Sequence, residues 1–210
     1  MSEQETHKKK RKMASVVELR PETIARHRER ELTSTIGMLV ALGSWAMMFA
    51  SLFFVYLGLR SQAIAWPPPG LTLPRLLPAL NTVVIVASSL TLARSLGELR
   101  RGRRKPAVWL IAATFVLGSL FVALQIVLWR GMWLGGITPS TGTLGTVVYA
   151  LTALHAVHVV AGLAVLAFLL LLSVRGEELG RRATTLKLCG MFWHFVDAVW
   201  VVMFVGMFIL

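Results

Sequence analysis

Cysteine and charged residues are both scarce in this chain of 210 residues. The single cysteine, Cys189, excludes an internal disulfide and a metal site built from thiolates, so we expect it to serve in buried packing. Charged residues make up only 15% of the sequence, whereas apolar residues make up 56%. This balance fits a membrane protein better than a soluble domain of the same length.

Long apolar runs give the fold class. A helix that crosses a membrane needs about 20 apolar residues, because each residue adds about 1.5 Å along the helix axis. Five segments meet this length, at about Thr33–Leu59, Leu77–Leu96, Ala107–Trp129, Thr143–Val174 and Leu186–Leu210. The sequence therefore predicts an all-α membrane protein, a bundle of five transmembrane helices. We expect two regions, a basic cytoplasmic tail over 1–31 and a five-helix membrane domain over 32–210.

The basic residues are distributed unevenly between the two sides of the predicted bundle. Nineteen of the 22 lysines and arginines fall in the N-terminal tail and in the two loops on the same side, and three fall in the opposite loops. The positive-inside rule then predicts a cytoplasmic N-terminus and an outer C-terminus, which an odd number of spans also requires. The basic run Lys8–Lys12 precedes a span, so we expect it to anchor the topology at anionic lipid rather than to bind nucleic acid.

Polar side chains within the predicted spans are the candidate functional residues. A charged side chain at membrane depth costs roughly 2.5 to 3.5 kcal/mol, so such residues usually face protein, headgroups or a polar cavity. Asp197 is the only carboxylate inside a long apolar run, and His194 lies three residues before it on the same helical face. This spacing predicts a hydrogen-bonded pair. We expect the candidates to hold lipid or to orient helices, and the full set is His155, His158, His194, Asp197, Gln125, Asn81 and Trp66.

Redox or transport chemistry remains an alternative for the histidines. His155 and His158 share a helical face, but a metal ion would need further ligands that this chain barely supplies. His158 and His194 form the only kind of pair that could ligate a haem between facing helices, as in a small membrane b-type cytochrome. The same histidines with Asp197 could serve a proton-coupled carrier. The spans hold too few histidines for a copper–haem centre, so we expect no catalytic, cofactor-binding or metal-binding residue here.

Five motifs in chain order resemble one family. They are Met47–Tyr56 in the first span, Trp66–Gly70 followed by Leu80–Thr82 and Ser88–Thr91, Leu117–Phe121 with Gln125, His155–Val159 with Gly162, and the sequence WHFVDAVW at Trp193–Trp200. Together they resemble subunit III of the haem-copper terminal oxidases, in its five-span bacterial form. The WHFVDAVW segment is the most specific of the five.

The resemblance implies an accessory, metal-free subunit of a respiratory cytochrome c oxidase in the bacterial cytoplasmic membrane. Such a subunit packs on catalytic subunit I, with subunit II in the same complex. It binds phospholipid and supports proton uptake and complex integrity in aerobic electron transport, while haem and copper belong to the catalytic partner. An accessory subunit of a quinol oxidase or of a nitric oxide reductase is the alternative within the wider family.

Two positions depart from the family pattern. The family commonly carries a glutamate in the first span and another after the glutamine of the third span, and these positions are Trp45 and Leu128 here. The resemblance therefore implies that any proton-linked or lipid-linked work of those carboxylates cannot be done by the same groups in this chain.

Overall fold

The computed structural model describes residues 21–64, 74–140, 142–175 and 182–209, and these are helical except at the connections. The helices are α2 (Pro21–Gln62), α3 (Leu76–Arg100), α4 (Arg104–Leu134), α5 (Thr143–Val174) and α6 (Ala183–Phe204), and α6 continues into a π-helix, η2 (Val205–Ile209). Within the described ranges, five helices are long and apolar enough to cross a membrane, which confirms the predicted five-helix class. Trp66 and most of the N-terminal tail lie outside the described residues.

The helices extend beyond the apolar runs that predicted them. The first begins at Pro21 rather than near Thr33, and the third ends at Leu134 rather than near Trp129. Hydrophobicity marks only the part of a helix that matches the hydrocarbon thickness, whereas backbone hydrogen bonding continues into polar sequence. By its internal contacts the chain divides after Leu39, and all of the contacts discussed below lie within residues 40–210.

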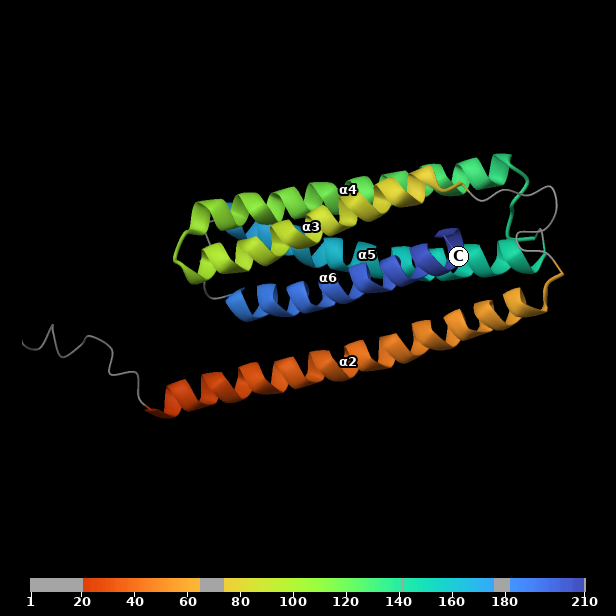
Figure 1. Ribbon diagram of the computed structural model, residues 1–210. Helices are drawn as coiled ribbons and strands as arrows, with labels where there is room; N and C mark the ends of the chain where they lie inside the picture. Colours follow the sequence, from red (N-terminus) through yellow and green to blue (C-terminus); the bar gives the residue numbers. More distant parts are fainter. Residues whose placement is uncertain (1–20, 65–73, 141, 176–181, 210) are drawn as a thin grey trace, which may run out of the picture. The chain divides into compact units, whose positions relative to one another are not determined.

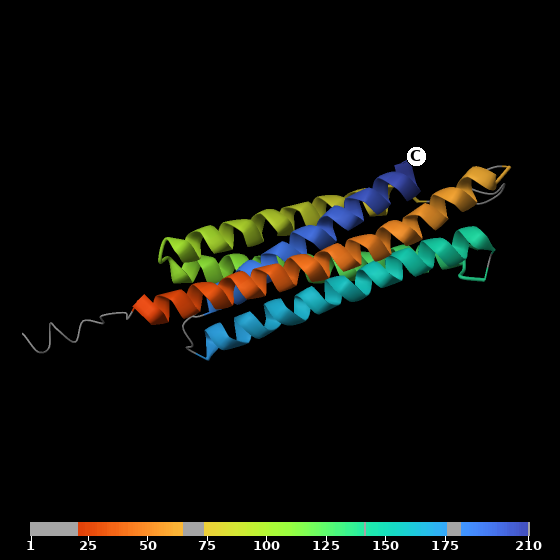
Figure 2. The same cartoon turned by 90° about the horizontal axis from the view of Figure 1, so that it is seen from below.

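Helices α3 and α4 form a hairpin and lie side by side in both views (Figures 1 and 2). Helix α6 packs against α3 and α5, and α5 also packs against α4. The inward face of α3 follows a helical repeat and includes Asn81, Ser88 and Ser95, all fully buried. Small and hydroxyl-bearing residues at such a contact let the helix backbones approach closely, which is how helices associate in lipid.

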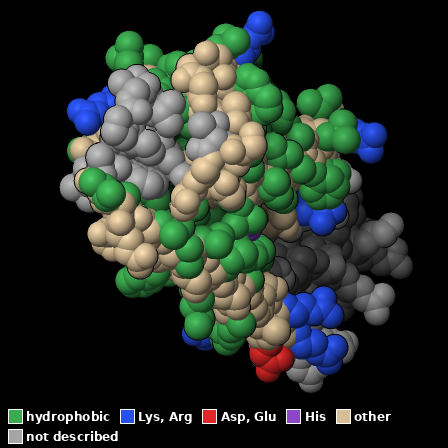
Figure 3. Space-filling view, turned by 90° about the vertical axis from the view of Figure 1, so that its right-hand side faces the viewer, with side chains coloured by type: hydrophobic (Ala, Val, Ile, Leu, Met, Phe, Trp, Pro, Cys, Tyr) green, Lys and Arg blue, Asp and Glu red, His purple; other side chains and the backbone are tan. Residues whose placement is uncertain are grey.

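Large apolar side chains remain on the outer surface of these helices, and Figure 3 shows them over much of one end. Val83, Val116 and Phe168 are examples, each about half exposed or more. A soluble monomer rarely exposes so many apolar side chains, whereas a lipid-facing surface requires them. The exterior therefore agrees with the membrane class that the composition predicted.

Candidate functional site in the helix interior

Trp193 connects four helices at the centre of the interior. Its side chain in α6 is 1% exposed, and its Nε1–H donates a hydrogen bond of 3.1 Å to Ser88 Oγ in α3. The far edge of the indole lies against Gly118 in α4 and Gly162 in α5, where an added Cβ atom would come within 2.8 Å of the ring. Only glycine leaves room for the indole at these two positions, so the motif tryptophan and the two glycines form one packing unit.

Trp200 forms a second unit about two turns further along α6. Its Nε1–H donates a hydrogen bond of 3.0 Å to Thr82 Oγ1, and its ring meets Phe121 edge-on at a centroid distance of 4.9 Å. The His155 imidazole is 5.4 Å from the Trp200 ring and 5.7 Å from Phe121, and it is fully buried. The aromatic rings therefore enclose this histidine within the bundle.

Several buried polar atoms lie in the same interior without a hydrogen-bond partner. Asn81 Nδ2 donates to Gln125 Oε1 at 3.4 Å between α3 and α4. Within the described part of the chain, the atoms left unpaired are Asn81 Oδ1, Gln125 Nε2, both ring nitrogens of His155 and both carboxyl oxygens of Asp197. A polar group costs least inside a membrane when it faces the interior of a bundle. Asn81, Gln125, His155 and Asp197 occupy that environment.

The predicted hydrogen bond between His194 and Asp197 is wrong. The His194 side chain is exposed, and its Nδ1 shares a short hydrogen bond with Ser89 Oγ of α3. Asp197 is 6% exposed, and neither of its oxygens meets the geometry of a hydrogen bond to a described residue, although the Ser89 hydroxyl also interacts with its carboxyl group. Residues three apart share a helical face only approximately. Here the neighbouring helix supplies a hydroxyl that takes the imidazole away from the carboxyl group.

A double-mutant cycle tests whether His194 contacts Ser89 rather than Asp197. The variants Asp197→Asn and His194→Leu should couple less strongly with each other than His194→Leu couples with Ser89→Ala, because the two side chains share no direct hydrogen bond and meet only through Ser89. The coupling of Ser89→Ala with His194→Leu should exceed about 0.5 kcal/mol, as is usual for residues in direct contact. The measurement is the thermal midpoint of each purified variant. Coupling of His194 with Asp197 but not with Ser89 would contradict the observed contacts.

The side chain of His158, although only three residues after His155 in α5, lies in different surroundings. Its Nδ1 lies 2.7 Å from the carbonyl oxygen of Leu154 in the preceding turn. Its ring packs against Trp45 and Phe49 of α2, at centroid distances of 5.4 and 5.3 Å. Trp45 also meets Phe192 edge-on at 5.4 Å. The indole of residue 45, where the resemblance led us to expect a glutamate in other members, therefore packs against the His158 ring.

Tyr56 and Arg60 of α2 hydrogen-bond to Gly206 near the C-terminus, a contact that the apolar runs of the sequence did not predict. The Tyr56 hydroxyl donates a hydrogen bond of 2.9 Å to the carbonyl oxygen of Gly206, and Arg60 Nη1 donates to the same oxygen at 3.0 Å. Gly206 lies in the π-helix, where the altered hydrogen-bond pattern frees carbonyl groups. The Phe53 ring covers Gly206 so closely that a Cβ atom there would overlap it. The only sequence signal was Tyr56 at the end of the first motif.

The candidate residues thus fall into three environments. Asn81, Gln125, His155 and Asp197 are buried, His158 is partly buried among aromatic rings, and His194 reaches the surface of residues 40–210. In the described part of the chain, no three histidine, cysteine or acidic side chains gather in a way that could hold a metal ion. Leu128, the second position at which the resemblance led us to expect a glutamate, is a fully buried core residue.

The fold and its interior define a multi-pass helical membrane protein, with tryptophan, hydroxyl and imidazole side chains packed between apolar spans. The family model described as cytochrome c oxidase subunit III matches residues 25–210. The chain belongs to this family, as the motifs predicted. Membership places it in a complex with other oxidase subunits.

Curated relatives agree with this assignment. A cytochrome c oxidase subunit 3 of Thermostichus vulcanus is 29% identical over 185 residues, which cover 83% of this chain and 86% of the relative. A probable cytochrome c oxidase subunit 3 of Mycobacterium tuberculosis is 32% identical, covering 81% and 84% respectively. The similarity to the Danio rerio subunit 3 is 30% identity over 68% of this chain and 54% of the relative. The two bacterial relatives therefore match over most of their lengths.

Proposed function

We propose that this chain packs directly on subunit I of a bacterial cytochrome c oxidase, with subunit II in the same complex, and maintains the integrity of the assembly. The interior of the bundle carries the proposal. Trp193 and Trp200 fill the space between the helices and hydrogen-bond to hydroxyl groups of α3. A bundle closed by packed indoles is suited to a rigid accessory subunit. The electron-transfer groups, haem and copper, then belong to the catalytic partner.

The proposal places the complex in the cytoplasmic membrane, with the N-terminus inside and the C-terminus outside. The distribution of lysine and arginine between the loops supports this orientation. The basic tail over 1–31 then lies at the cytoplasmic surface, and residues 32–210 form the membrane domain. Phospholipid bound to the outside of the bundle supports the complex during turnover. Among the candidate residues, the exposure of His194 supports a contact with such a lipid or a neighbouring subunit, and the burial of the others supports a role in orienting helices.

A b-type cytochrome is a less suitable interpretation of the histidines. An axial ligand must present a ring nitrogen to an iron atom, with room for the macrocycle beside it. The His155 ring is enclosed by Trp200 and Phe121, and the His158 ring by Trp45 and Phe49. His194 Nδ1 is engaged with Ser89. These contacts favour structural roles for all three histidines.

An optical spectrum of the purified chain tests this interpretation. The chain separated from its partners should show no Soret band and should contain neither iron nor copper in stoichiometric amounts, because His155 and His158 are packed against aromatic rings and His194 is hydrogen-bonded to Ser89. Metal analysis of the same sample checks the result independently. A Soret band that disappears in a His158→Leu variant would show that the chain is a cytochrome.

Support of proton uptake is the second part of the proposal, and in this chain it must operate without a carboxylate at residue 45. Asp197 is then the only carboxyl group deep in a span, and both its oxygens are inaccessible to solvent. A hydrophobic carbodiimide modifies protonated carboxyl groups in apolar surroundings. We expect it to leave the first span, which has Trp45 in place of a carboxylate, unlabelled, and the activity of the complex should not be inhibited through this subunit. Peptide mass mapping after labelling makes the measurement. Inhibition that rises in proportion to Asp197 modification would assign this residue a direct role in proton exchange.

A further inference from the structure

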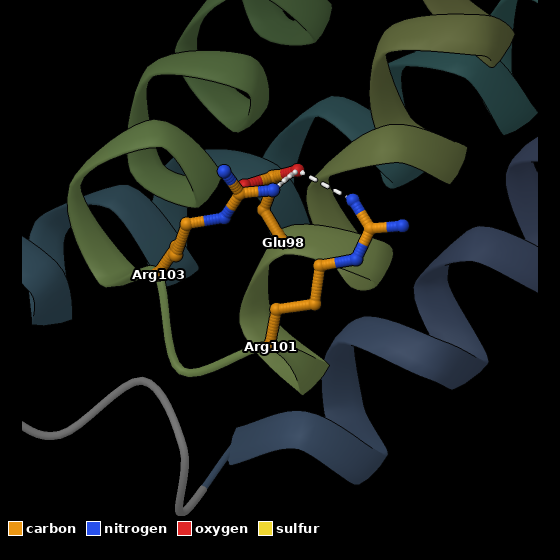
Figure 4. A network of polar contacts seen from close by, with 3 residues as sticks. All are labelled: Glu98, Arg101 and Arg103. Carbon is orange, nitrogen blue, oxygen red and sulfur yellow. Dashed lines mark hydrogen bonds and ion pairs between the residues drawn. The ribbon is translucent and has the colours of Figure 1, made fainter.

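The turn between α3 and α4 is closed by backbone hydrogen bonds and by ion pairs to one carboxylate, Glu98. Glu98 lies between two arginines of the turn (Figure 4). Arg103 pairs closely with it, with Nε 2.7 Å from Oε2 and Nη2 2.9 Å from Oε1. Arg101 approaches Oε1 only at 3.4 Å. Gly102 adopts a left-handed conformation, with φ of 73°, which closes the turn. The two helix ends are therefore fixed relative to each other.

A cavity of about 740 Å³ lies at this end of the hairpin, between the last turns of α3 and the first turns of α4. Its lining includes Arg94, Glu98, Arg101, Pro106, Trp109 and Leu110. The cavity is lined by charged groups from α3 and by apolar groups from α4. This combination suits a ligand with one charged end and one apolar end.

The charge of the lining is positive. Glu98 forms its close, two-point ion pair with Arg103, which leaves the more distant Arg101 guanidinium largely in solvent, with a side-chain exposure of 69%. Arg94 makes no ion pair or hydrogen bond with any of the described residues. Two arginines therefore face the cavity with at most one weak contact to a carboxylate. Guanidinium groups in this situation bind phosphate oxygens, often with two parallel hydrogen bonds.

The apolar side of the cavity continues along the bundle toward mid-membrane. Trp109 is 77% exposed, and Val116 and Leu120 follow it at seven and eleven residues, on the same helical face. On α3, the exposed Leu90 lies one turn from Arg94, in the direction of the bundle centre. An acyl chain could lie along this surface while its headgroup occupies the cavity. Exposed tryptophan is also typical of the level of the lipid headgroups.

We propose that this cavity binds the phosphate-bearing headgroup of an anionic phospholipid. The continuous apolar track distinguishes a lipid from a soluble phosphate, which would gain nothing from it. The hairpin belongs to the basic side of the chain, where anionic lipid is attracted to lysine and arginine. The proposal rests on the membrane placement of the proposed function. It does not depend on which oxidase subunit the chain contacts.

Photo-crosslinking in the purified complex tests the site. The oxidase containing the full chain is reconstituted with phosphatidylglycerol or phosphatidylcholine that carries a diazirine near the headgroup, and labelled peptides are mapped by mass spectrometry. Phosphatidylglycerol should label the segment 94–110 at least about fivefold more than phosphatidylcholine, since each arginine near an anionic surface contributes about that factor. An Arg94→Gln and Arg101→Gln double variant should lose this preference.

The matched control is Arg130→Gln, which removes an exposed arginine at the opposite end of α4 and should leave the labelling unchanged. Arg94→Gln alone should give an intermediate loss, so the test remains decisive if the double variant does not assemble. Excess inorganic phosphate should not displace the probe. Equal labelling by both lipids, unchanged labelling in the double variant, or displacement by inorganic phosphate would each overturn the proposal. Haem absorbance and co-purification of partner subunits, measured on the same samples, report separately on the proposed function.

Discussion

Replacing Gly162 with alanine should destabilise the bundle by about 1 to 3 kcal/mol, although the added group is one methyl. The new Cβ atom would lie 2.8 Å from two carbons of the Trp193 ring and 3.2 Å from Phe192. The indole cannot easily move aside, because Ser88 holds its Nε1–H and the side chain is almost fully buried. The strain must therefore separate α5 from α6.

A second glycine provides the control for this experiment. Gly131 in α4 has no atom within 4 Å of its added Cβ position, so Gly131→Ala should be neutral or stabilising through its better helix propensity. The double variant Gly162→Ala with Trp193→Phe should be destabilised by less than the sum of the two single changes, because the smaller ring leaves room for the methyl group. The thermal midpoint in detergent is measured for all variants. Equal stability of the two glycine variants would contradict the packing of Trp193.

Removal of the Trp200 side chain should destabilise the bundle by about 3 to 5 kcal/mol. The ring is fully buried, packs edge-on against Phe121 and encloses His155. Trp200→Ala would leave a cavity between four helices, since none of these neighbours can fill the space. Trp200→Phe keeps much of the aromatic packing and should cost less, mainly the hydrogen bond to Thr82.

Trp109, which is exposed where Trp200 is buried, provides the control for this experiment. It is 77% exposed, so Trp109→Ala should change the thermal midpoint little. The two alanine variants remove the same side chain, and only burial differs between them. A comparable loss of stability in both would show that the interior is not organised around Trp200.

The sequence predicted the five helices because each apolar run is long enough to cross a bilayer and no soluble alternative can accommodate so many of them. It also indicated Trp193–Trp200 as the most informative segment. The structure shows why this segment is constrained, since Trp193, Val196, Asp197 and Trp200 all face the interior of the bundle. Helical periodicity alone gives such a face, but it does not name the partners across it.

The partners of the site residues come from distant parts of the chain, and this is where sequence reasoning was insufficient. Ser89 lies 105 residues from His194, and Tyr56 lies 150 residues from Gly206. The expected pairing of His194 with Asp197 used the only distance that a sequence provides, the spacing along one helix. Once α3 packs against α6, its hydroxyl groups compete for the imidazole and the indoles, and that outcome depends on tertiary packing.

The central claim is that this chain is a metal-free accessory subunit of an oxidase complex, and purification of the tagged full chain from native membranes in mild detergent tests it most directly. Subunit stoichiometry is measured by quantitative mass spectrometry, together with haem and copper content before and after the subunits are separated. The account predicts one copy of this chain for each haem-copper catalytic subunit, with all haem and copper remaining in the fraction that lacks it. Recovery of the chain without any oxidase subunit, or with haem or copper that follows it after separation, would contradict the account.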